Sequence, residues 1–471
     1  MSAQAQVQPQ LADEVIVYKK RRNVELLLLL LAQSFGFGGW AITHLNLYGE
    51  LPTNLAVVGG IWFGLGLATH LVVRFRLPYA DPVILPSVFL LNGLGLAMIY
   101  RIDQIPEPVR TDATKQLVWT ALGLVLFAAV ALALRDHRRL QRYPYLLFIA
   151  GLFLLLLPLA PVIGHASGGA RIWIRIFGMS FQPAEVAKIA LAIAFAAYFY
   201  EKREVLALAG KRFLGIEFPR ARDLGPIAIM WLASLAVMVF QNDLGTSLLF
   251  FGLFTVMIYI ATEKPAWPII AGLAFTAAGI AAAKFTNHVP RRLNAWLDPF
   301  SDYDRNLQII SAQFGFAWGG LFGRGWGLGR PGLTPLAKSD MIAAAIGEEL
   351  GVLGLMAVVM IYALLIARGF KTAVTSPDGF GKLLAAGLSF VFALQVFTII
   401  GGVTRLLPLT GLTTPFMSQG GSSLVANWII IAILMIISHR SRLPQAATAA
   451  PQDASALEAA SAQDATAVIS R

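Results

Sequence analysis

The sequence predicts an all-α fold, a polytopic bundle of transmembrane helices. Of the 471 residues, 57% are hydrophobic and only 13% are charged, whereas soluble domains carry about 25% charged residues. So few charges could not cover a globule of this size, and lipid must therefore solvate much of the chain. The apolar residues are also grouped in stretches of about 20, the length that an α-helix needs to cross a bilayer.

About twelve such stretches follow one another along the chain, and we expect each to form a membrane span. The break between the seventh and eighth, at Gln241–Asp243, permits two interpretations: a tight turn between two helices or a kink within one. The predicted spans are 24–43, 54–73, 82–100, 116–134, 143–163, 184–200, 225–240, 244–262, 266–284, 347–367, 379–402 and 422–438.

The basic residues indicate the orientation of these spans. The net charge of +11 would fit a nucleic-acid-binding protein, but Lys and Arg occur in short clusters between apolar stretches, which is typical of topology signals. Alternate loops carry most of these clusters, so we expect no nucleic-acid partner and a multi-pass protein of the bacterial cytoplasmic membrane with both termini in the cytoplasm. The ends, 1–23 and 444–471, lack large apolar periodicity and are expected to be disordered cytoplasmic tails around a membrane domain, 24–443.

One predicted outer segment breaks the charge bias. We call residues 285–346, between the ninth and tenth spans, the outer loop. Long loops cross the membrane regardless of their charge, so the basic residues of the outer loop raise the question of which anion they meet. These residues are Arg291, Arg292, Arg305, Arg324, Arg330 and Lys338.

The outer loop also carries three carboxylates within seven residues, Asp298, Asp302 and Asp304. Next to cations and water, they could supply a general base or hold a divalent cation such as Mg²⁺ or Mn²⁺. The alternative is a solvated acidic turn with an Asp-Pro cap. A run of glycines from Gly315 to Gly329 follows, and it permits tight turns and the close approach of a ligand. The chain has no cysteine, which excludes disulfides and thiolate metal sites.

Five short motifs follow one another over residues 171–440. Each combines Gly or Pro with polar or ionisable residues. They are Gln182-Pro-Ala-Glu185-Val-Ala-Lys188, Asp243-Leu-Gly-Thr246, Trp296-Leu-Asp298-Pro-Phe-Ser-Asp302, Asp340-Met-Ile through Gly347-Glu-Glu-Leu-Gly351, and Pro408-Leu-Thr-Gly411 through Pro415-Phe-Met-Ser-Gln-Gly-Gly-Ser-Ser423.

The order of these motifs resembles the SEDS family, whose members include RodA and FtsW. The resemblance implies an inverting peptidoglycan glycosyltransferase that polymerises lipid II at the outer face of the membrane, with undecaprenyl diphosphate as leaving group. It requires no cofactor, and it implies a class B penicillin-binding protein, a transpeptidase, as partner. The family usually has ten spans, so the two extra spans form an N-terminal pair before the motif at Gln182.

The resemblance assigns the catalytic role to Asp302, as the base that deprotonates the acceptor sugar. Asp298 is commonly Asn in the FtsW branch, so its retention favours the RodA branch, which acts in cell elongation and shape, over a division polymerase. The chain departs from the family pattern after Asp302, where Tyr303 replaces a proline and Asp304, Arg305 and Asn306 replace glycines, and at Lys338-Ser339, which replaces His-Thr.

Further site residues follow from charge and spacing. Glu185 and Lys188 lie on one side of a helix and would bind the substrate or orient the outer loop, or else form a self-neutralising structural pair. Outward cations could bind diphosphate or act as interfacial anchors. These cations are Arg171, Arg175, Arg291, Arg292, Lys338 and Arg405.

The remaining motif residues are predicted to be structural supports. We expect Gln182, Asp243, Thr246 and Asp340 to brace helix ends or hydrogen-bond networks. Glu348 and Glu349 could cap the start of the following helix. The segment that includes Ser422 would permit close helix packing or line the substrate groove.

Two other functions fit the same sequence features. A lipid II transporter would also be polytopic with buried ionisable pairs, but its polar groups should concentrate near the membrane midplane, where few are found. A non-catalytic scaffold would leave the acidic stretch around Asp302 unexplained. The enzyme is therefore the preferred interpretation.

Overall fold

The computed structural model describes residues 18–105, 110–161, 163–167, 170–176, 179–207, 212–213, 216–217, 225, 228–229, 231–233, 235–237, 241, 243–285 and 288–444. These residues fall into two compact units. One is the bundle, Lys20–Ser441, and the other comprises the two chain ends. Within the terminal unit, the guanidinium of Arg442 lies over the ring of Tyr18 at 5.2 Å from its centroid. Most of the predicted tails lie outside the described residues.

The predicted helical membrane fold is confirmed. Among the described residues, nine helices are long and apolar enough to cross a membrane, and two further apolar helices, α5 (Pro144–Leu156) and α9 (Ala266–Phe285), accompany them. The predicted span 225–240 lies partly outside the described residues. The nine helices are α1 (Arg22–Tyr48), α2 (Leu55–Arg76), α3 (Ile84–Asp103), α4 (Asp112–Ala133), α6 (Pro183–Ala207), α8 (Leu244–Thr262), α12 (Ile342–Thr375), α13 (Gly379–Val403) and α14 (Gly421–Ser441).

The observed bounds agree with those predicted from apolar composition for some of these helices and differ for others. α8 has the predicted bounds, and Asp243 caps its first turn, so the chain starts a separate helix there rather than continuing through a kink. α12 starts five residues before its predicted apolar stretch, 347–367, and ends eight residues after it. Its backbone leaves helical geometry at Gly351, where φ is 72°.

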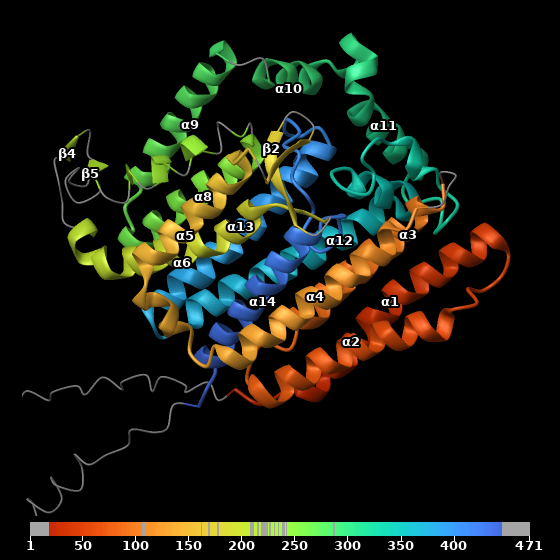
Figure 1. Cartoon of the computed structure of the whole chain (residues 1–471), viewed down its shortest axis with the longest axis horizontal. Coiled ribbons are helices and arrows are strands. Elements are labelled where there is room, and N and C mark those ends of the chain that lie inside the picture. The colour runs from red at the N-terminus through yellow and green to blue at the C-terminus, as the bar shows by residue number, and fades with distance from the viewer. Residues whose placement is uncertain are drawn as a thin grey trace, which may run out of the picture. The chain divides into compact units, whose positions relative to one another are not determined.

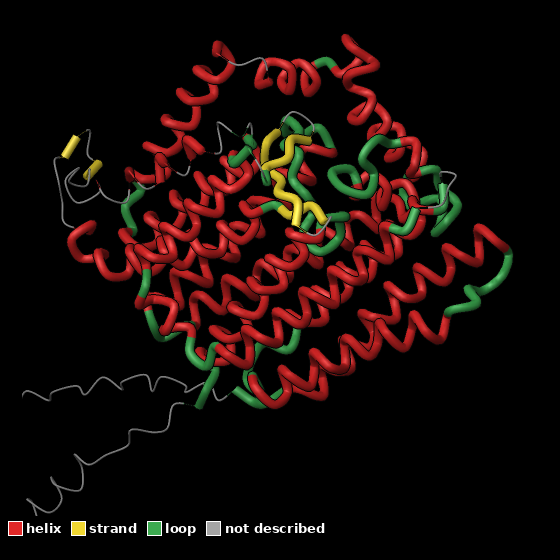
Figure 2. Tube along the Cα trace, in the orientation of Figure 1, coloured by secondary structure: helices red, strands yellow, loops and turns green. Residues whose placement is uncertain are grey.

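The chain also contains short strands that the all-α prediction did not include. β1 (Gly164–Ser167), β2 (Ala170–Ile176) and β3 (Met179–Phe181) form an antiparallel sheet in that order, which Figure 2 shows in yellow among the helices. A two-residue pair, β4 (Arg212–Phe213) and β5 (Ile216–Glu217), forms a second hairpin. The alternation of Ile with Arg or Trp along β2 is the period-two signal that predicts a strand.

The outer loop is largely helical. It folds into α10 (His288–Leu297), the 3-10 helix η3 (Pro299–Asp302), α11 (Tyr303–Gly319) and the 3-10 helix η4 (Pro331–Leu333). In Figure 1, α10 connects α9 with α11 along the upper edge of the view. α11 packs against α12, so the loop is attached to the bundle.

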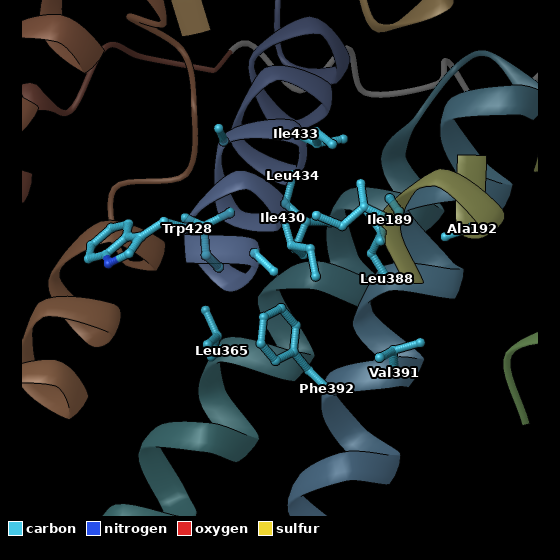
Figure 3. Close-up of a cluster of buried hydrophobic side chains, with 14 of the residues drawn as sticks. Ile189, Ala192, Leu365, Leu388, Val391, Phe392, Trp428, Ile430, Ile433 and Leu434 are labelled. Carbon is cyan, nitrogen blue, oxygen red and sulfur yellow. The ribbon is translucent and has the colours of Figure 1, made fainter. Parts of the chain in front are cut away.

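α14 is the most deeply buried of the nine long helices. Trp428 of α14 is fully buried, and its ring contacts those of Phe89 at 5.3 Å and Phe416 at 5.6 Å between centroids. Figure 3 shows this apolar core, with Phe392 and Leu388 of α13 beside Ile430 and Leu434 of α14. Aromatic rings at these separations add about 0.5–1.5 kcal/mol per pair to the stabilisation from burial.

The two N-terminal helices, α1 and α2, pack on the helices that follow them in the chain. α1 contacts α3 and α2 contacts α4. A Cβ on Gly36 of α1 would lie 2.6 Å from the Cα of Gly93 in α3, so these two helices approach each other at glycines. Small residues permit such close packing in membranes, where helix association depends on van der Waals contact.

Candidate active site

A cavity of about 420 Å³ lies where α10, η3 and the start of α11 meet two segments from later in the chain. Its walls combine cations, carboxylates and amides with a few apolar side chains. The lining residues include Arg291, Arg292, Asn294, Ala295, Ser301, Asp302, Arg305, Asn306, Gln308, Ile309, Asp340, Leu409 and Gly411.

Asp302 lies at this cavity with its carboxylate partly open to solvent. It is the N-cap of α11, a position that Asp favours, and its Oδ1 accepts a hydrogen bond from the backbone N–H of Arg305 at 3.3 Å. Its Oδ2 lies 3.4 Å from the Arg305 guanidinium, and the side chain is 44% exposed. Asp302 is therefore both a helix cap and a carboxylate that a ligand can reach.

Asp298 and Asp304 are exposed and do not appear among the cavity residues. Asp298 precedes η3 without forming a side-chain cap, and Asp304 lies in the first turn of α11. Across the part of the chain that the structure describes, no three His, Asp or Glu side chains form a group suited to a metal ion. The three outer-loop carboxylates are close in sequence but do not converge on one point.

Arg292 connects α10 to the segment that follows α13. It donates hydrogen bonds to the carbonyl oxygens of Leu409 at 3.1 Å and Thr410 at 3.0 Å. Burial lowers the pKa of its guanidinium, and the charges of Asp243 and Asp340 act in the opposite direction. Arg292 is therefore a brace whose charge is shared by two carboxylates, not an open diphosphate-binding cation.

The pKa values of both carboxylates, Asp243 and Asp340, are raised. Burial raises the pKa of Asp340 to about 6, against the lowering effects of a hydrogen bond from Ser339 and of the nearby Arg292. Burial also raises the pKa of Asp243, and the charge of Glu185 adds to this rise, whereas hydrogen bonds with Thr246 and the charge of Arg292 lower it. Arg292 thus interacts with three of the five motifs: with Asp243 and Asp340 through charge, and with the motif that begins at Pro408 through hydrogen bonds.

Glu185 and Lys188 form a buried ion pair in the first turns of α6, with 2.8 Å between Oε2 and Nζ. Lys188 also lies 3.5 Å from the Oε1 of Gln395, whose amide donates to the carbonyl of Thr413 at 2.8 Å. The carbonyl of Gln182 accepts the N–H of Glu185 at 3.2 Å. The pair joins α6 to α13, and its carboxylate reaches Asp243 electrostatically.

The structure gives the other predicted cations different partners. Arg405 donates to the carbonyls of Trp296 at 3.1 Å and Leu297 at 3.2 Å, so it holds the end of α10. Lys338 is buried and forms ion pairs with Asp103 and Asp112. Arg171 and Arg175 are exposed on β2. Arg291 and Arg292 line the cavity.

Arg305 is a cavity residue that the sequence-based site prediction missed. The available signal was its position three residues after Asp302, on the same side of a helix. Gln308, one turn further along α11, also lines the cavity and was missed in the same way. Both follow from treating the start of α11 as a helix instead of a loop.

The Glu348–Glu349 prediction is wrong in its geometry. Both residues lie inside α12 rather than at its cap. Glu348 accepts the backbone N–H of Arg330 at 2.5 Å, and Glu349 accepts that of Gly327 at 3.0 Å. They therefore fix the glycine-rich end of the outer loop.

Ser422 is buried in the first turn of α14. A Cβ on the adjacent Gly421 would lie 2.2 Å from the Trp119 ring, so this motif permits close packing of α14 on α4. Of the two roles predicted for the motif, the structure shows the packing role at Gly421.

Comparison with known proteins defines the class. Residues 83–443 match the cell cycle protein family of FtsW, RodA and SpoVE, and the chain belongs to this SEDS family. α1 and α2 precede the matched region. The family prediction from the five motifs is therefore confirmed.

Relatives define the activity. The chain is 48% identical to the peptidoglycan glycosyltransferase RodA of Mycobacterium tuberculosis, over 90% of this chain and 92% of the relative. It is 32% identical to a probable peptidoglycan glycosyltransferase FtsW of Geobacter sp., over 77% and 97%. It is a peptidoglycan glycosyltransferase of the RodA type, as predicted from the retention of Asp298.

Solved structures agree with this assignment. One chain, from a structure on the coordination of polymerization and crosslinking by a peptidoglycan synthase complex, has a TM-score of 0.63 and 25% identity, covering 78% of this chain and 99% of that one. RodA of Thermus thermophilus has a TM-score of 0.54 and 26% identity, covering 77% and 98%. The multi-pass SEDS fold is thus shared with these proteins.

Proposed function

We propose that this RodA-type enzyme polymerises lipid II at the outer face of the cytoplasmic membrane, with Asp302 as the general base. The observation that carries the proposal is the cavity in which the accessible carboxylate of Asp302 lies beside Arg291 and Arg305. A base and an anion-binding group in one cavity are what transfer between a sugar hydroxyl and a sugar diphosphate requires.

The proposed reaction is a direct displacement with inversion. The Asp302 carboxylate takes the proton of the acceptor sugar's 4-hydroxyl while that oxygen forms a bond to the anomeric carbon of the donor. The bond from this carbon to the diphosphate breaks, and undecaprenyl diphosphate leaves with the electron pair. Arg291 and Arg305 stabilise the charge that develops on the diphosphate, because guanidinium groups match phosphate oxygens.

The membrane arrangement is part of the same proposal. Alternating basic clusters support cytoplasmic termini and an outer loop, 285–346, within a membrane domain, 24–443. The match of the family model to residues 83–443 supports a ten-span core preceded by the pair α1 and α2. With 225–240 included, this arrangement has about twelve spans.

A transpeptidase of the class B penicillin-binding type is the proposed partner. Its support is the similarity to the chain from a peptidoglycan synthase complex in which polymerization and crosslinking are coordinated. A divalent cation, Mg²⁺ or Mn²⁺, is a separate proposal; it would take single oxygen ligands from Asp298 or Asp304, because the outer-loop carboxylates do not converge on one point.

The test uses the purified protein with its transpeptidase in detergent, where no membrane sidedness exists. We expect glycan strands from lipid II, and at least a hundredfold less product from Asp302→Ala. Parallel reactions with a chelator, and with Mg²⁺ or Mn²⁺ restored, measure any metal requirement. Absence of strands from well-folded parental protein would contradict the proposal and favour a transporter.

A further inference from the structure

A second cavity, which we call the N-terminal cavity, lies among α1, α2, α3 and α4, the four helices at the lower right of Figure 1. Its volume of about 360 Å³ falls within the range of about 300–1,000 Å³ that is typical of ligand sites. α1 and α2 precede residues 83–443, which match the family. Two of the four helices that form this cavity are therefore outside the matched region.

The polar residues of the N-terminal cavity lie at one end of it. His44 and Tyr100 belong to the final turns of α1 and α3, Thr53 and Asn54 precede α2, and Thr114 is in the first turn of α4. Short connections join α1 to α2 and α3 to α4, and the Nδ1 of His44 lies 2.6 Å from the Tyr100 hydroxyl. These helix ends therefore meet on the same side of the membrane.

The cavity is apolar at the other end. Phe37, Trp62 and Gly93 lie about two helical turns deeper than the polar residues of their own helices. The Trp40 ring joins the two ends, at 5.5 Å from the Phe37 ring and 5.9 Å from the Tyr100 ring between centroids. Among the described residues that line the cavity, none is Asp, Glu, Lys or Arg. The lining thus suits a molecule with a hydrocarbon part and an uncharged polar part.

The depth of the cavity corresponds to one leaflet of a bilayer. Gly36 and His44 are eight positions apart on α1, which corresponds to about 12 Å along the helix axis. The hydrocarbon layer is about 30 Å thick, so one leaflet contributes about 15 Å. A membrane-spanning helix of a partner would need a groove along the whole layer. The cavity therefore suits a lipid better than a helix.

We propose that the N-terminal cavity binds one acyl chain of a phospholipid from the outer leaflet. The chain lies along Phe37 and Trp62, and the ester oxygens accept hydrogen bonds at the polar end. Thr114 is exposed and His44 and Tyr100 are partly exposed, so a lipid can reach these groups. The cavity recognises the chain and not the headgroup, because its lining carries no Lys or Arg.

Phospholipid is the occupant that the position favours. It is the bulk component of the bilayer around these helices, so mass action keeps even a site of modest affinity filled. The choice of the outer leaflet rests on the proposed orientation of the spans. The site itself goes beyond the proposed function, and its test does not depend on polymerisation of lipid II.

The test places the full-length protein in vesicles of phosphatidylethanolamine and phosphatidylglycerol. A phosphatidylglycerol probe carries a diazirine in the middle of one acyl chain, and mass spectrometry of peptides locates the label after illumination. We expect label on the cavity residues of α1 and α3. Label on the exposed side chains Ile149 and Phe153 of α5 reports ordinary boundary lipid and serves as the internal reference.

Val58→Trp fills the cavity from α2. Relative to the α5 reference, the label on α1 and α3 should fall at least about tenfold, because the chain loses the burial of several methylene groups. The matched control is Val57→Trp, since Val57 is 63% exposed and does not line the cavity. It should keep the parental label.

A second pair of variants guards against misfolding. Leu117→Trp fills the cavity from α4, and its control is Val118→Trp, at an exposed neighbour outside the lining. A parental melting temperature identifies the variants that fold. The inference is overturned if the parental protein carries no label on α1 and α3, or if folded Val58→Trp and Leu117→Trp keep it.

Three further arms distinguish other occupants. A phosphatidylcholine probe with the same chain should label the same residues, and a preference above about fivefold, the effect of one Lys or Arg near the surface, would contradict recognition of the chain alone. Loss of the cavity label when undecaprenyl phosphate is added at a small fraction of the phospholipid would assign the site to an isoprenoid chain. Loss on adding the transpeptidase would assign it to a partner helix. Either loss would overturn the inference.

Discussion

Two parts of the outer loop carry similar charges but use them differently. Near the end of the loop, Lys338 is buried and pairs with Asp103 and Asp112. The backbone N–H of Gly327 donates to Glu349 of the bundle, which binds Arg101 at 2.9 Å. Around Asp302 and Arg305 the pair is exposed, at 44% and 78%. Buried pairs hold the loop in place, whereas exposed charges remain accessible to a substrate. Charge alone therefore does not identify the site.

The largest effect is expected when the charge of Asp302 is removed while its role as the N-cap of α11 is kept. Asn is as good an N-cap as Asp, so Asp302→Asn should retain the start of α11 and the melting temperature. General base catalysis contributes about 10²–10⁴-fold, and polymerisation of lipid II should fall by that factor. An active Asp302→Asn enzyme would show that Asp302 is a cap and no more.

The second test removes a buried charge. Lys338→Met leaves the buried carboxylate of Asp103 without its cation, which costs about 3–5 kcal/mol, measured as a lower melting temperature in detergent. The control is Lys115→Met, whose side chain is 68% exposed and pairs with Asp112 at 3.2 Å. This control should change stability by less than about 1 kcal/mol. Equal effects from the two variants would erase the distinction between buried and exposed pairs.

The third test concerns the exposed cation. Arg305→Gln should raise KM for lipid II about tenfold at low salt, since a charge-assisted bond to phosphate contributes about 1.5–3 kcal/mol. The difference should shrink in high salt, because exposed charges are screened. Arg324→Gln, exposed on the same loop but absent from the cavity, should leave KM unchanged. If Arg324→Gln raised KM and Arg305→Gln did not, the anion site would lie at Arg324 and not in the cavity.

The fourth test measures a pH dependence of stability at Asp340. Its pKa rises from 3.8 in the reference state to about 6 in the fold, so its stabilising contribution is complete below 3.8 and is lost as pH rises through 6. Relative to Asp340→Asn, the parental protein should therefore lose about 2–3 kcal/mol of its free energy of unfolding between pH 4 and 7. Melting curves across this range measure it, and parallel curves would contradict the burial of Asp340.

Much of the fold could be predicted because the bilayer imposes one rule on every span. α8 has the predicted bounds, and α13 ends within one residue of them. The strand β2 was missed because membrane-span periodicity dominated the interpretation, although its Ile residues alternate with Arg and Trp. Local composition is enough to predict a membrane-spanning helix. It is not enough to predict whether a short segment between spans forms a strand.

The site was predictable only in part. The motifs identified Asp302 as the base and Asp340 as a support, and the charge of the outer loop identified Arg291, because local patterns carry residue identity. The partners of Lys338 could not be predicted, since Asp103 is 235 positions away, and neither could the approach of Thr410 to Arg292. Tertiary contact distinguishes a buried brace from an accessible cation.

The central claim, that Asp302 works outside the membrane, can be tested directly by labelling. The chain has no cysteine, so Asp304→Cys and Lys382→Cys each introduce a single thiol at an exposed position. In intact cells, a membrane-impermeant thiol reagent should label Asp304→Cys and spare Lys382→Cys until the cells are lysed. Labelling of Lys382→Cys in intact cells, with Asp304→Cys protected until lysis, would contradict the account.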